Sequence, residues 1–278
     1  MSDLFLRYPG TVWGILLLLA LLGAGLVGLA LQIRSVKSGG PDKWDETQEG
    51  YIVSAVVTLL AFMIGFTFAL ALDRFEGRRQ LVGQDARAIE ELYLKAQILE
   101  EPHRSAVSNI LVQYTDNRIQ LASLRSNELG KAEALNDKLT KDLWKASMAA
   151  FQTIRGIDFS SAFVDSANRV IDLNSARIAA RKAQIPGEVL LALFIYAVVT
   201  AAILGYVLKG RRSRVAGVTL LFLYVMLMSL LIDLNQPTTG FIRESQGPME
   251  HLSRWMHANN SASFGPSQLP AISSETAR

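Results

Sequence analysis

The sequence predicts an all-α integral membrane protein with four transmembrane helices and a helical extramembrane domain between the second and the third. Half of the 278 residues are hydrophobic, and they gather in four runs of about 20 residues, the length that crosses a bilayer as a helix. A polar region with helical periodicity separates the second run from the third. The sequence lacks sustained alternating β-branched runs and Asn-Gly or Asp-Gly hairpin signals, so strands are not expected.

Composition excludes several classes of function. The net charge of +3 is too small an excess to indicate nucleic-acid binding, and the absence of cysteine excludes disulfides, thiol catalysis and cysteine-bound metals. The three histidines, His103, His251 and His257, lie outside the apolar runs and form no HExxH-type motif. No P-loop and no G-x-S-x-G motif is present. We therefore expect neither an enzyme nor a bound cofactor or metal.

The first apolar run, residues 11–31, is interpreted as a retained span. Arg7 is the only basic residue before it, and the run is longer than the apolar part of a secretory signal, which is about 7–15 residues. Ala20, Ala24 and Gly28 recur every four residues and predict a close helix–helix contact, within one protomer or between protomers. The alternative is that glycine and alanine are simply common in membrane helices.

The second run, residues 51–72, contains no charged residue and would be about 33 Å long as a helix, enough to cross a bilayer. It turns charged at Asp73 without a proline or turn cluster, so one long helix is predicted, half in lipid and half outside. Thr58, Phe62 and Phe66 fall on one face of this helix at intervals of four residues. Such a stripe can line a pore, or it can pack against helices or lipid.

The rest of the chain completes a four-part organisation. Residues 1–72 hold the first transmembrane pair and residues 73–186 the helical domain, which Pro186 ends. The second pair, residues 187–234, consists of the runs 187–208 and 215–234, joined by a short basic link. Residues 235–278 form a C-terminal segment that we expect to be disordered beyond about residue 258, where serine, proline and asparagine prevail.

Four spans put the N-terminus, the domain and the C-terminal segment on one side of the membrane. The orientation stays open: the basic link at residues 209–214 favours the cytoplasm for its own side. The arginines that flank the domain, such as Arg74, Arg78 and Arg181, argue for the opposite orientation.

Two stretches carry a resemblance to a known family. Residues 62–96 leave the second run through an aromatic and basic segment that includes Gly65 and Arg74, and then contain Asp85-Ala86-Arg87-Ala88-Ile89. Residues 233–248 hold Asp233, Pro237 and Gly240, followed by Ser-Gln-Gly-Pro. With the order of spans and domain, these stretches resemble the bacterial bestrophin-like membrane domain family. The chain departs from the family pattern at Arg87, where asparagine is usual, and at Thr238 or Thr239, where phenylalanine is expected.

The resemblance implies an oligomeric ion channel, commonly a pentamer, in the inner membrane, with membrane lipids, other copies of the chain and permeating ions as its partners. It also implies that Thr58, Phe62 and Phe66 line a hydrophobic neck. Thr58 replaces a usually bulky apolar residue there, and the acidic run that holds calcium in animal bestrophins is absent. The alternative from another class is a non-conducting membrane scaffold or sensor whose helical domain binds a partner.

Asp233 has two interpretations, because a carboxylate close to the end of a span is costly unless it is paired or solvated. It can belong to an ion pathway. It can also act as a cap-like acceptor that bonds the turn at residues 235–240, with Arg74 or an arginine of the domain as an additional partner. The sequence favours the second interpretation.

Overall fold

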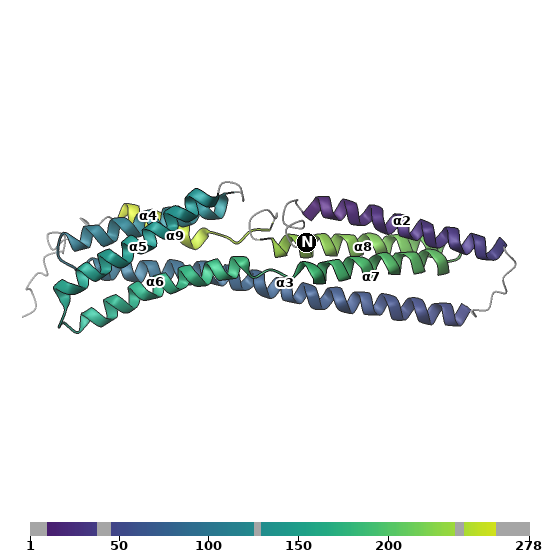
Figure 1. Cartoon of the computed structure of the whole chain (residues 1–278), viewed down its shortest axis with the longest axis horizontal. Coiled ribbons are helices and arrows are strands. Elements are labelled where there is room, and N and C mark those ends of the chain that lie inside the picture. The colour runs from purple at the N-terminus through teal and green to yellow at the C-terminus, as the bar shows by residue number, and fades with distance from the viewer. Residues whose placement is uncertain (1–9, 38–45, 125–128, 237–241, 260–278) are drawn as a thin grey trace, which may run out of the picture. The chain divides into compact units, whose positions relative to one another are not determined.

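The computed structural model describes residues 10–37, 46–124, 129–236 and 242–259, and these residues form helices and no strand (Figure 1). The helices are α2 (Gly10–Lys37), α3 (Glu46–Ala96), α4 (His103–Ser123), α5 (Leu129–Ile154), α6 (Phe159–Lys182), α7 (Gly187–Val207), α8 (Arg211–Asn235) and α9 (Gly247–Ala258). The predicted all-α class is confirmed.

Contacts divide the chain into two compact units. The span unit consists of Met1–Glu76 and Ala183–Arg243, and the domain unit of Gly77–Lys182 and Glu244–Arg278. Helix α3 supplies residues to both. The four-part division made from the sequence stays a prediction, and the proposed disorder beyond residue 258 falls largely on residues outside the described part of the chain.

Four helices of the described residues are long and apolar enough to cross a membrane. The four predicted runs lie in α2, α3, α7 and α8. Helix α3 is continuous over 51 residues, as the sequence predicted, and Gly77 and Gly83 do not interrupt it. Each of these glycines costs a helix about 1 kcal/mol relative to alanine, and side chains buried on either side of them, such as Ala71, Val82 and Ile89, supply tertiary contacts that offset this cost.

The core of the span unit is built from leucine-rich faces of α2, α3, α7 and α8. Its buried members include Leu21, Leu60, Ala201, Leu231 and Ile232. Helices α2 and α7 approach most closely at glycines: a Cβ added to Gly28 would lie 2.0 Å from the Ala202 carbonyl oxygen, and one added to Gly205 would lie 2.0 Å from the Gly25 carbonyl oxygen. Only glycine permits this backbone contact.

The domain unit has a separate core, in which the second half of α3 packs with α4, α5, α6 and α9. Leu92, Tyr93, Leu111, Leu143 and Phe163 are among its fully buried side chains. A polar pair is also buried in the domain unit: the Asn136 amide on α5 donates a hydrogen bond to the side-chain oxygen of Asn174 on α6 at 3.0 Å.

Helix α9 adds a part of the domain unit that the sequence did not predict. Met249, Leu252 and Met256 are buried in the core of this unit. The Ser253 hydroxyl on α9 donates to the Asp116 carboxylate on α4 at 2.6 Å. The Tyr93 ring packs edge-on against Trp255, with the ring centroids 5.8 Å apart. Helix α9, in the C-terminal segment, is therefore a packed part of the domain unit.

Candidate functional site

The apolar half of α3 has one face that no helix of its own protomer covers. Phe62 and Phe66 are 65% and 66% exposed, and Thr58 is exposed as well. The opposite face carries Leu60 and Ile64, which are buried in the core of the span unit. The sequence-predicted stripe therefore points away from the protomer, toward lipid or toward another copy of the chain.

The same face continues past the aromatic residues to a carboxylate. Asp73 follows Phe66 by seven residues, which is about two helical turns, and it is exposed. The stripe predicted from the sequence ended at Phe66 and did not include Asp73. The signal that places it on the stripe is the spacing Phe62, Phe66, Ala69, Asp73, at steps of four, three and four residues.

Gly65 lies on this exposed face too, and its environment differs from that of Gly28. A Cβ added to Gly65 would meet no atom within 4 Å, whereas one added to Gly28 would collide with α7. Packing within the protomer therefore does not require glycine at position 65. A requirement for glycine there would have to come from a molecule outside the protomer.

A buried charge cluster lies in the domain unit, centred on Asp85 of α3. One carboxylate oxygen of Asp85 accepts hydrogen bonds from Nε and Nη2 of Arg118 on α4, at 3.2 and 3.0 Å. It also accepts one from Nη1 of Arg177 on α6, at 2.8 Å. All three side chains are buried. The cluster thus joins three helices through one carboxylate.

Burial and the second arginine shape the electrostatics of this cluster. The pKa of Arg177 is lowered because the side chain is buried and because the charge of Arg118 lies close by. Tyr114 packs beside it, with the Arg118 guanidinium carbon 5.3 Å from the ring centroid. Burial raises the pKa of Tyr114 above its usual value, so the phenol stays neutral. Since one carboxylate faces two guanidinium groups, Asp85 is the counter-charge on which the cluster depends.

The end of α8 is anchored by two polar side chains in the span unit. Asp233 is buried, and its Oδ2 accepts a hydrogen bond from the backbone N–H of Ile242 at 2.8 Å. The Asn235 side-chain oxygen accepts one from the backbone N–H of Ile185 at 2.8 Å. The Asp233 carboxylate therefore ties the end of α8 to the backbone of Ile242, nine residues further along the chain.

Comparison with known proteins places this architecture. The sequence profile of the Bestrophin-like domain matches residues 19–249, most of the chain. The chain belongs to the bestrophin-like family. No curated protein matches the sequence.

Solved structures of a bacterial bestrophin homologue from Klebsiella pneumoniae share the bestrophin-like fold. One is 15% identical, with a TM-score of 0.65 over 92% of this chain and 99% of that chain. A tryptophan-to-alanine variant gives a TM-score of 0.67 at 15% identity, over 93% and 99% of the two chains. A leucine-to-threonine variant gives 0.66 at 14% identity, over 87% and 96%. At these identities the likeness shows the fold, and with the four apolar helices it shows a membrane protein.

The predicted resemblance is thus confirmed, and the residues that suggested it can be located in the structure. Gly65 is exposed, Arg74 is half-buried, and Asp85 and Asp233 are buried with the partners described above. Pro237 and Gly240 lie outside the described residues. Asp85 and Asp233 both act as hydrogen-bond acceptors that tie separate segments together.

The small-residue stripe of the first span contributes to packing inside the protomer. Gly28 is buried against α7, and Ala24 packs on the core of the span unit, while Ala20 is half-buried. The closest approach uses Gly25 and Gly28 with Gly205 of α7. The partner position on α7, Gly205, was not singled out from the sequence.

Proposed function

We propose that this bestrophin-like chain is the subunit of a homo-oligomeric ion channel whose hydrophobic neck is lined by Thr58, Phe62 and Phe66. The observation that carries the proposal is the uncovered aromatic face of α3 within a membrane-spanning segment. Family membership supports the same class of function.

Oligomerisation is a premise of this proposal. One protomer has four spans and a single aromatic stripe, which cannot enclose a path for ions. Several copies can ring an axis, and closed cyclic symmetry is the usual arrangement of identical chains. The family resemblance favours a pentamer. Gly65 supports a close approach at the axis, since its open side has no occupant within the protomer.

The neck would act through its lack of water. Rings of apolar side chains around an axis gate by dewetting, while the positive edges of aromatic rings interact with passing ions. Thr58 makes one end of the neck more polar than a bulky apolar residue would. Asp73 would form a ring of carboxylates at the other end, where it raises the local concentration of cations.

The proposal also includes the membrane in which the channel lies. Helical spans suit the inner membrane, because proteins of the bacterial outer membrane cross it as closed β-barrels. The domain formed by α4, α5, α6 and the second half of α3 would lie outside the bilayer, where its charged surface is solvated.

Recordings from the purified, reconstituted oligomer in planar bilayers test the proposal. Phe62→Ala and Phe66→Ala should each increase the open probability or the leak, because a dry constriction is widened. Phe222→Ala is the matched control, since Phe222 is an exposed aromatic of the span helix α8. An intact oligomer that passes no current under any ionic condition would instead favour the membrane scaffold.

A further inference from the structure

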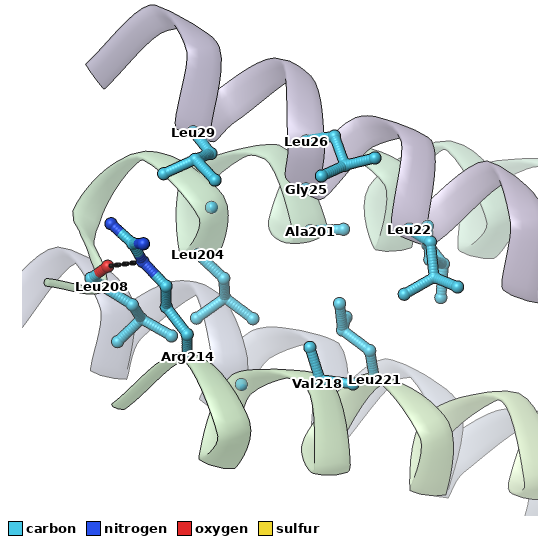
Figure 2. Close-up of a pocket in the computed structure, with 13 residues that line it drawn as sticks. Leu22, Gly25, Leu26, Leu29, Ala201, Leu204, Leu208, Arg214, Val218 and Leu221 are labelled. Carbon is cyan, nitrogen blue, oxygen red and sulfur yellow. Dashed lines mark hydrogen bonds between the residues drawn. The ribbon is translucent and has the colours of Figure 1, made fainter. Parts of the chain in front are cut away.

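The span unit contains an apolar cavity of about 360 Å³ between α2, α7 and α8 (Figure 2). Its buried floor includes Leu21, Ala201, Leu204 and Leu221. The rim is open: Leu26 is 66% exposed and Val218 is 52% exposed. The volume lies at the lower end of the range of about 300–1,000 Å³ that is typical of small-molecule sites.

The cavity exists because small residues line it. Gly25 and Gly205 bring α2 and α7 into backbone contact, and no side chain from either position reaches toward α8. On α8, Gly217 faces Leu208, whose methyl group would lie 2.6 Å from an added Cβ. An empty space of this size would forfeit dispersion contacts that packed interiors normally make. In a bilayer, a hydrocarbon chain is the material available to fill it.

One basic residue stands at the mouth of this otherwise apolar cavity. Arg214 is the only charged side chain among the residues that line it, within the described part of the chain. Figure 2 shows its Nε directed at the Leu208 carbonyl oxygen, to which it donates at 3.3 Å. The terminal nitrogens make no ion pair with any described residue, and they are the atoms that bind phosphate oxygens in a bidentate manner.

The surroundings of Arg214 add positive potential. It lies in the first turn of α8, where free backbone N–H groups and the helix dipole favour an anion. Arg211 and Arg212 precede it and are exposed. Lys209, which also precedes it, pairs with Glu49 at 3.1 Å.

We propose that this cavity binds one acyl chain of an anionic phospholipid, whose phosphate is held by Arg214 at the start of α8. An apolar slot that ends in a guanidinium group matches an amphiphile with a negative headgroup at the membrane interface. The site is separate from the exposed face of α3, and its occupancy does not depend on whether the protein conducts ions.

Native mass spectrometry of the intact, detergent-solubilised assembly tests this site. The probes are phosphatidylglycerol and phosphatidylcholine with identical palmitoyl and oleoyl chains, added in equal amounts. The unaltered protein should retain phosphatidylglycerol preferentially. Arg214→Gln should reduce that preference about fivefold, which corresponds to ~1 kcal/mol per basic residue near the membrane surface. Arg212→Gln, two residues before it and outside the cavity lining, should have a clearly smaller effect.

A second pair of variants tests the cavity itself. Val218→Trp should fill the space and abolish retention of both lipids. Val215→Trp introduces the same side chain at an exposed position of α8 that does not line the cavity, and it should leave retention unchanged. Should Val218→Trp fail to fold, Leu26→Trp on the opposite rim replaces it. The proposal would be overturned if Arg214→Gln and the cavity-filling variant both retained the two lipids as the unaltered protein does. A cavity-filling variant that keeps its lipids but loses its neighbouring protomers would overturn it too, since the occupant would then be another copy.

Discussion

Nη1 of Arg177 lies 2.8 Å from Oδ2 of Asp85, although 92 residues separate the two in the chain. This contact and the Arg118 contacts hold α3, α4 and α6 together inside the domain unit. Replacing Asp85 with asparagine would leave two buried guanidinium groups without a counter-charge. We predict a loss of about 3–5 kcal/mol in the free energy of unfolding of this unit.

Thermal unfolding of the purified protein in detergent measures this effect. The control is Asp172→Asn, which removes an exposed carboxylate of α6 and should change stability by less than about 0.5 kcal/mol. Equal melting temperatures for the two variants would show that the cluster contributes nothing to stability.

A second prediction concerns the contact between α2 and α7. Gly28→Ala places a methyl group 2.0 Å from the Ala202 carbonyl oxygen, so the helices must separate, at a cost of about 1–3 kcal/mol. Gly23→Ala is the matched control in the same helix, because its added Cβ meets nothing within 4 Å. That control should be neutral or slightly stabilising, since alanine favours a helix. Resistance to unfolding in detergent should therefore fall only for Gly28→Ala.

A third prediction is a small pH dependence in the domain unit. The Glu91 carboxylate accepts a hydrogen bond from Lys95 Nζ at 2.8 Å, and chiefly for this reason its pKa lies below the usual 4.5. A depressed pKa means that the stabilisation is present above pH 4.5 and is lost as the pH falls through the lower, folded-state value. Because Glu91 is partly exposed, the contribution should stay below about 1 kcal/mol. The melting-temperature difference between the unaltered protein and Glu91→Gln should vanish on acidification, with Glu90→Gln as the exposed control.

A fourth prediction concerns ion preference. If the face of α3 lines the axis, then Asp73→Asn removes a ring of negative charges and should lower the permeability of cations relative to anions. The reversal potential in a potassium chloride gradient reports this change. Glu188→Gln removes an exposed carboxylate in the first turn of α7 and should leave the potential unchanged. A shift in the control but not in Asp73→Asn would place the ion path away from α3.

The spans and the unbroken helix α3 could be predicted from the sequence because uncharged runs and helical periodicity are local signals. The partners of Asp85 could not, since Arg118 and Arg177 come from helices whose mutual packing no local pattern specifies. Helix α9 could have been found: Pro248 near its start is followed by Met249, Leu252 and Met256 at helical spacing. For the exposed stripe on α3, the residue spacing identifies the face of the helix. It does not specify whether lipid or another protomer covers that face.

The most direct test of the channel proposal uses the absence of cysteine from the chain. Single cysteines at Thr58 and Phe62, with Phe222→Cys on α8 as the control, are introduced without background labelling. Currents through the reconstituted oligomer are then recorded while a charged, water-soluble methanethiosulfonate reagent is applied. Modification at positions 58 and 62 should block or strongly alter the current, while modification at position 222 should not. Unaltered currents at 58 and 62, with a change at 222, would contradict a neck lined by α3.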